Sequence, residues 1–68
     1  MLGRLTEREK EIARLLGNLY TDEAIGLVLN MKQSAVKTTI RRIIEKLNAG
    51  SRAQLVLNIT EDTWQRNE

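Results

Sequence analysis

The stretch QSAVKTTIRRIIEKL, from Gln33 to Leu47, decides the fold of this 68-residue chain. Its apolar residues are separated by steps of four, three, one and three, which places them on one stripe of an α-helix. These are Val36, Ile40, Ile43, Ile44 and Leu47. The opposite side is polar and basic, with Ser34, Lys37, Thr38, Arg41 and Arg42. One face of the helix therefore suits a hydrophobic core, and the other suits an anionic partner.

The positive charge of the chain is concentrated around this stretch. Between Lys32 and Arg52, six basic residues stand against one acidic residue, Glu45, so the segment carries +5. The whole chain carries only +2. A basic helix face alone is more often a solvated surface than a binding site. Here the charge is segregated on one exposed face with almost no carboxylate, and this pattern favours a nucleic-acid partner.

Composition excludes several classes of function. The chain contains no cysteine and no histidine, which rules out disulfides, the usual zinc sites and Cys–His or Ser–His catalysis. We therefore expect no metal, no cofactor and no enzymatic activity. No apolar run approaches the roughly 18 residues of a membrane span, and no signal-peptide pattern opens the chain. We expect a cytoplasmic protein without a membrane partner.

Start and stop signals divide the chain into four helices. Thr6 and Glu9 have the spacing of a capping box, and so do Ser51 and Gln54. Thr21 is a suitable cap for the helix that follows it. Nothing has the pattern of a strand, so we predict one all-α helix-turn-helix domain over residues 1–68, with 61–68 as a loose tail. The expected helices span residues 7–16, 22–29, 33–47 and 52–60.

The connections carry residues that suit unusual backbone conformations. Asn30, Asn48 and Gly50 suit the left-handed conformation that often ends a helix. Gly26 lowers helix propensity, and we interpret it as a point of close backbone approach by the following helix. Residues 1–5 are expected to be a frayed lead. The predicted buried face of the second helix consists of Ala24, Ile25, Val28 and Leu29.

A short helix, a turn of about three residues and a longer basic helix together indicate a helix-turn-helix. In this arrangement the second helix enters the DNA major groove and the first lies across the backbone. Side chains on the first two turns of the inserted helix reach base edges. The expected base-reading residues are Gln33, Ser34, Lys37, Thr38 and Arg41. The expected phosphate contacts are Arg42, Lys46 and the helix start at Thr21.

Three motifs resemble a known family. They are LTEREKEIARLL at residues 5–16, TDEAIGLVL at 21–29, and SAVKTTIRRIIEKLNAGSRAQLV at 34–56. In this order and spacing they resemble the LuxR/FixJ/GerE helix-turn-helix domain over about residues 5–59. The resemblance implies a four-helix domain of a transcription regulator, which binds double-stranded DNA as a homodimer through its fourth helix. RNA polymerase or another regulator is a further candidate partner.

The resemblance also implies roles for individual residues. Lys37, Thr38 and Arg41 match base-reading positions of the family, whereas Ser34, Arg52 and the Thr21 region match backbone-contacting positions. The implied core and dimer contacts are Leu55, Val56 and Ile59.

The chain departs from the family pattern at several positions. Leu19 stands where Gly is usual, and Gly26 where Ala is usual. Lys32 replaces the usual capping Ser and adds a charge near the expected phosphates. Ala35 replaces a Thr whose hydroxyl could contact phosphate. Two alternatives therefore stay open: a helix-turn-helix module that pairs with or inhibits another regulator without binding DNA, and a sigma-factor-like promoter-reading domain.

Overall fold

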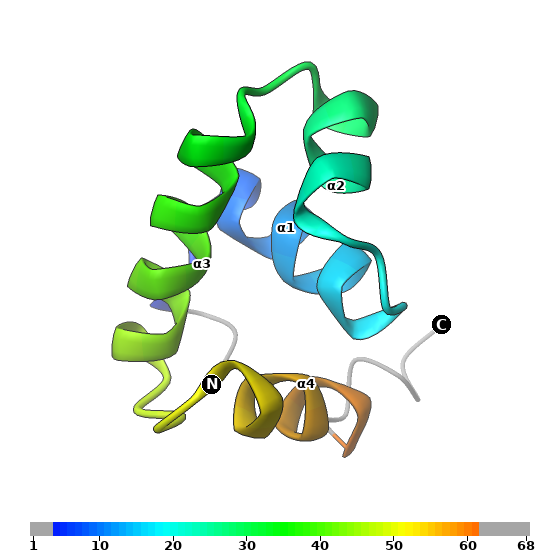
Figure 1. The fold of residues 1–68 in the computed structure, drawn as a ribbon. Helices are drawn as coiled ribbons and strands as arrows, with labels where there is room; N and C mark the ends of the chain where they lie inside the picture. Colours follow the sequence, from blue (N-terminus) through cyan, green and yellow to red (C-terminus); the bar gives the residue numbers. More distant parts are fainter. Residues whose placement is uncertain (1–3, 62–68) are drawn as a thin grey trace.

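The computed structural model describes residues 4–61, which form four α-helices (Figure 1). No strand occurs among the described residues, and this confirms the predicted all-α class. Residues 62–68, most of the expected loose tail, lie outside them. The helices are α1 (Glu7–Gly17), α2 (Asp22–Leu29), α3 (Gln33–Lys46) and α4 (Arg52–Glu61).

Two helices, α1 and α3, form the centre of the fold, because each of them contacts all of the other three helices. A short turn joins α2 to α3 at the top of Figure 1, and α4 crosses the lower end of the molecule. Within residues 4–61, the buried core contains aliphatic side chains only, so its cohesion depends on close packing rather than on aromatic rings. Its members are Leu5, Ile12, Ala13, Leu16, Ile25, Val36, Ile40, Ile43, Ala49, Leu55 and Ile59.

Hydroxyl side chains cap the first two helices as predicted. The amide of Glu9 donates to Thr6 Oγ1 at 3.1 Å. In return the amide of Thr6 donates to Glu9 Oε1 at 2.8 Å, so the capping box of α1 is complete. At α2 the amide of Ala24 donates to Thr21 Oγ1 at 3.1 Å. Both helices therefore begin where the sequence predicted, because each cap needs only a partner three residues away.

The other two helix starts are less fully capped. Ser51 Oγ accepts a hydrogen bond from the Gln54 amide at 3.1 Å. The side chain of Gln54 instead donates to Asn58 Oδ1 at 2.9 Å, one turn ahead. The predicted second capping box was therefore wrong in one of its two hydrogen bonds, the one from the residue-54 side chain back to the cap. At α3 the cap residue Lys32 makes no side-chain hydrogen bond to the helix, as expected from the loss of a capping hydroxyl.

Left-handed backbone occurs at the predicted helix ends and at one unexpected residue. Asn30, Asn48 and Gly50 have φ values of 57°, 53° and 86°, as their positions predicted. Leu19, in the connection between α1 and α2, has a φ of 67°. This conformation costs a residue with a Cβ about 1–2 kcal/mol. The Leu19 side chain is also 78% exposed, so core packing does not offset the strain.

Two predictions about burial were wrong. Leu5, expected in a frayed lead, is only 5% exposed and belongs to the core. Val28, expected on the buried face of α2, is 57% exposed. In the same helix Ile25 and Gly26 are buried, so the inner face of α2 is narrower than helical periodicity predicted.

The turn between α2 and α3 closes directly onto Gly26. The amide of Met31 donates to the Gly26 carbonyl at 2.8 Å. A Cβ added to Gly26 would lie 2.6 Å from the Met31 carbonyl oxygen. Backbone does approach Gly26 closely, but the prediction that the following helix makes this approach was wrong, because the backbone that comes near belongs to the turn. A glycine is required here because backbone, unlike the end of a flexible side chain, cannot move aside cheaply.

We expect Gly26→Ala to lower the free energy of unfolding by about 1 kcal/mol. The clash with the Met31 carbonyl costs about 1–3 kcal/mol, and the better helix propensity of alanine returns about 1 kcal/mol. Urea unfolding followed by circular dichroism measures the difference. The control is Leu27→Ala at the neighbouring exposed position, which should change stability by less than about 0.5 kcal/mol. A Gly26→Ala variant more stable than the wild type would contradict the close contact.

A buried ion pair ties the start of α1 to the end of α3. Lys46 Nζ lies 2.8 Å from Glu9 Oε1, the same oxygen that accepts the amide of Thr6. The Glu9 side chain is almost completely buried. Burial raises the pKa of this carboxyl group, but the hydrogen bonds from Lys46 and Thr6 outweigh burial and hold the pKa below its usual value. The charged form of Glu9 is therefore part of the folded structure.

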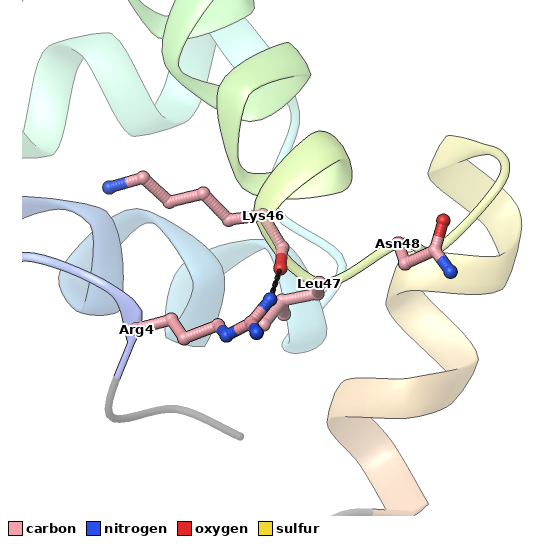
Figure 2. A pocket seen from close by; sticks show the side chains of 4 residues that line it. All are labelled: Arg4, Lys46, Leu47 and Asn48. Atoms are coloured by element: carbon pink, nitrogen blue, oxygen red, sulfur yellow. Dashed lines mark hydrogen bonds between the residues drawn. The ribbon is translucent and has the colours of Figure 1, made fainter.

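A second contact reinforces the same junction. Arg4 Nη1 donates to the Lys46 carbonyl oxygen at 3.1 Å (Figure 2). This bond satisfies one of the carbonyl groups that the end of α3 leaves without an intrahelical partner. Beside it an open cavity of about 220 Å³ is lined by Arg4, Lys46, Leu47 and Asn48. The chain before α1 thus packs against the end of α3, which explains why Leu5 is not frayed.

The Glu9 contacts make folding stability depend on pH in the acid range. Because the folded pKa of Glu9 is lowered, its contribution is complete above the unfolded pKa and is lost as the pH falls through the folded pKa. We expect Glu9→Gln to reduce stability near neutral pH by about 1–3 kcal/mol, and to flatten the loss of stability below pH about 4.5. Thermal unfolding as a function of pH measures both effects.

The matched control for this prediction is Glu7→Gln. Glu7 lies in the same first turn, but its side chain is exposed and pairs with Lys10 at 3.5 Å. This variant should keep the stability and the acid dependence of the wild type. If Glu9→Gln and Glu7→Gln behave alike, the Glu9–Lys46 pair does not contribute to stability as described.

Candidate nucleic-acid interface

The outer face of α3 is polar, basic and exposed over the first three turns of the helix. The helical stripe Val36, Ile40 and Ile43 is buried in the core, so the opposite stripe faces solvent. All five side chains predicted to read bases are exposed on this stripe: Gln33, Ser34, Lys37, Thr38 and Arg41. The structure therefore brings the predicted base-reading residues together on one surface of one helix.

The cations on this face have no carboxylate partner within the described part of the chain. The ion pairs of residues 4–61 involve other basic residues: Arg8, Lys10, Lys46 and Arg52. Lys32, Lys37, Arg41 and Arg42 are all exposed and take part in none of these pairs. The only acidic residue of α3 is Glu45, near its end. The face therefore has a positive potential that internal pairing does not neutralise.

Thr39 lies beside this face but takes no part in it. Its side chain is buried, and its hydroxyl donates to the Ala35 carbonyl at 2.9 Å. Such a bond to the previous turn satisfies the hydroxyl inside the helix. The exposed polar face of α3 therefore includes Thr38 but not Thr39. On the next turn it continues with Arg41 and Arg42.

The residues predicted to contact the DNA backbone fall into different environments. Lys32 and Arg42 are exposed and unpaired within residues 4–61. Thr21 is exposed, with its hydroxyl engaged as the α2 cap. Arg52 pairs with Asp22 at 2.7 Å, although its side chain stays 44% exposed. Lys46 is directed to Glu9 and away from the polar face, since its ammonium group is held in the buried pair.

The three residues predicted for a dimer surface on α4 differ in their exposure to solvent. Leu55 and Ile59 are buried in the core of the domain, so their side chains support α1 and α3 from inside. Val56 is half-buried, and Leu57, which the sequence placed off the apolar face, is 52% exposed. An apolar surface of α4 that a partner could reach is therefore formed by Val56 and Leu57.

Sequence reasoning missed two features near the interface. Asp22 was interpreted only as a favourable charge at a helix start, whereas it is buried and pairs with Arg52. No local pattern signals this, because the two residues are far apart in the chain. The second feature is the exposure of four apolar side chains on α2 and in the connection before it. These are Leu19, Tyr20, Leu27 and Val28.

The tight turn between α2 and α3 and the exposed basic face of α3 define a class of protein. Such a domain is a DNA-binding helix-turn-helix of the kind found in transcription regulators. The chain belongs to the luxR family of bacterial regulatory proteins, because the GerE family model matches residues 3–59. The family is one of DNA-binding regulators and not of enzymes. The resemblance inferred from the sequence motifs is thereby confirmed.

Two curated relatives agree with this family. The chain is 32% identical over 60 residues to the transcriptional regulatory protein DegU of Brevibacillus brevis, covering 88% of this chain and 25% of that protein. It is 40% identical over 60 residues to the transcriptional regulatory protein YvfU of Bacillus subtilis (strain 168), covering 88% of this chain and 30% of that protein. The chain thus spans less than a third of either relative. No solved structure matches it significantly.

Two further observations concern the described residues. None of the helices within residues 4–61 has the length and apolarity needed to cross a membrane. In the same part of the chain, no three acidic side chains cluster in a way that could hold a metal ion.

Proposed function

We propose that this domain is the sequence-specific DNA-binding part of a transcription regulator, with α3 inserted in the major groove of double-stranded DNA. One observation carries the proposal: Lys37, Arg41 and Arg42 stand exposed on α3 without a carboxylate partner within residues 4–61. A cation that is not paired internally gains most from a phosphate or a base edge. Membership of the luxR family supports the same reading.

The side chains at the start of α3 have the chemistry for reading bases. Arg41 can donate two parallel hydrogen bonds to a guanine, and Gln33 can form the bidentate pair typical of adenine. Lys37 also suits guanine acceptors, whereas Ser34 and Thr38 bond to either kind of edge. All five occupy one exposed stripe. We assign base reading to these five residues.

The phosphate contacts follow from what remains exposed around that stripe. We assign them to Lys32, Arg42 and Arg52, together with the start of α2 at Thr21. Lys46 is left out of this set, since its ammonium group already serves the buried carboxylate of Glu9. Removing it from Glu9 to reach a phosphate would leave a buried charge uncompensated, which is costly.

Pairing of two domains would let the protein read two half-sites. The exposed apolar positions Val56 and Leu57 on α4 support a homodimer through this helix. A twofold dimer on DNA reads an inverted repeat, because the symmetry of the protein is mirrored in the site. Both curated relatives are named transcriptional regulatory proteins, and the chain covers 25% and 30% of their lengths. We therefore assign it the role of a DNA-binding effector domain.

A second candidate function is a protein-interaction module that acts on another regulator without binding DNA. Four exposed apolar side chains favour this alternative: Leu27 and Val28 on α2, and Leu19 and Tyr20 in the connection before it. Exposed apolar side chains are a common feature of protein contacts. A protein-interaction role does not explain why the cations on the outer face of α3 have no carboxylate partner within residues 4–61. DNA binding is therefore the preferred function.

Selection of bound sequences from a random duplex pool tests the function directly. We expect enrichment of an inverted repeat, with binding that weakens steeply as the salt concentration rises. Enrichment of a single half-site would keep base reading and remove the dimer. The absence of both enrichment and salt-sensitive binding would contradict DNA binding and favour the interaction module.

Two neighbouring arginines separate base reading from phosphate contact. Arg41→Ala should weaken binding to the selected site by about 1–3 kcal/mol and relax specificity at one base pair. Arg42→Ala should weaken binding to selected and random duplexes alike, and lower the salt dependence by about one phosphate equivalent. Fluorescence anisotropy titrations over a range of salt concentrations measure both. Equal losses on all duplexes for Arg41→Ala would remove it from the base-reading set.

A further inference from the structure

An ion pair joins the first residue of α2 to the first residue of α4. Asp22 Oδ1 lies 2.7 Å from Arg52 Nη1. The aspartate side chain is only 10% exposed, whereas the arginine side chain is 44% exposed. The pair is therefore asymmetric: the carboxylate is held inside the domain, and the guanidinium group reaches it from the surface.

The buried carboxylate oxygen has no partner other than this arginine within residues 4–61. Asp22 Oδ1 is enclosed by protein and accepts no aligned hydrogen bond from any described residue. A buried charge without a counter-ion is strongly unfavourable, so Arg52 is kept close to Asp22. An exposed arginine would otherwise sample many rotamers. The pair thus restricts one end of a long side chain that remains open to solvent at the other.

We propose that Asp22 is a positioning residue, which holds Arg52 at the start of α2 so that its exposed edge binds a DNA phosphate. This inference rests on the proposed function and adds the group that orients one of its phosphate contacts. The guanidinium group has five donors arranged in a planar fork, and Nη1 serves Asp22. The remaining donors stay available to an anion.

The place of the pair in the fold supports this role. In a helix-turn-helix the first helix of the pair lies across the DNA backbone, and here that helix is α2. Its start carries the Thr21 cap and backbone amides that favour an anion, together with the carboxylates of Asp22 and Glu23, so a cation is needed there to attract a phosphate. Asp22 brings Arg52, from a different helix, to this same end. The phosphate contact is consequently assembled from two helices.

A positioning role for Asp22 and a purely electrostatic role change DNA affinity in opposite directions when the carboxylate is removed. Asp22→Asn removes a negative charge near a polyanion, which alone would strengthen DNA binding. If Asp22 positions Arg52, the variant instead loses affinity by about five- to tenfold, since a charge-assisted contact to phosphate becomes poorly oriented. The measurement is anisotropy of a fluorescent random-sequence duplex at several salt concentrations. The salt dependence should fall by about one phosphate equivalent.

Glu23→Gln is the matched control. Glu23 is the next residue of α2 and is exposed, so its removal changes the charge equally without touching Arg52. This variant should bind DNA as tightly as the wild type or more tightly. If Asp22→Asn behaves like Glu23→Gln, the aspartate acts only through its charge and the proposal is wrong.

Substitutions of Arg52 separate orientation from loss of folding. Arg52→Ala should weaken binding as much as Asp22→Asn, and the double variant should lose no more than either alone. Arg52→Lys keeps the charge but lacks the fork, so it should restore only part of the affinity. Thermal unfolding identifies any variant that fails to fold, and the comparison then rests on the folded ones.

The outcomes distinguish this proposal from the proposed function. A wild-type protein without salt-sensitive DNA binding would refute the function itself. Wild-type binding together with unchanged or stronger binding by Asp22→Asn would refute only the positioning role. Additive losses in the double variant would also refute it, because the two residues would then act independently.

Discussion

The carboxylate of Glu9 is the group on which the rest of the structure most depends. It accepts the amide of Thr6 and the ammonium group of Lys46 on one oxygen atom. These contacts define the start of α1 and anchor the end of α3, although Glu9 and Lys46 are 37 residues apart in the chain. Because Glu9 is buried, loss of either partner leaves a charge poorly compensated. The end of α3 is consequently held against the first turn of α1, while the buried apolar stripe of α3 determines which of its faces is exposed.

This anchoring divides the basic residues of α3 into two kinds. Lys46 belongs to the interior contact at the end of the helix, whereas Lys37, Arg41 and Arg42 stand on the outer face without internal partners within residues 4–61. Charge counting along the chain treats all four as equivalent. The fold makes them different, and only the outer three contribute to a surface that an anion could approach.

Features with partners close in the chain could be predicted from the sequence. The caps at Thr6 and Thr21 and the left-handed residues Asn30 and Gly50 each depend on backbone within a few positions. Helical periodicity likewise placed the stripe of α3 that is exposed. For these elements the local chain contains all the information that the structure uses.

Features with distant partners could not be predicted in the same way. Leu5 is buried because the chain before α1 packs against the end of α3. Val28 is exposed although helical periodicity placed it on the buried face of α2. Lys46 and Asp22 each form an ion pair with a residue of another helix, Glu9 and Arg52 respectively. The base-reading residues stay predictions, since their assignment concerns a partner outside the chain.

The strained backbone of Leu19 has a consequence for how the domain tolerates change. This exposed leucine keeps a left-handed conformation that glycine adopts at no steric cost. A small domain that retains such a residue is not at its stability optimum, since selection removes only variants that fall below the level needed for function. The rest of the domain therefore folds in spite of a local cost of about 1–2 kcal/mol, which a glycine at this position would not incur.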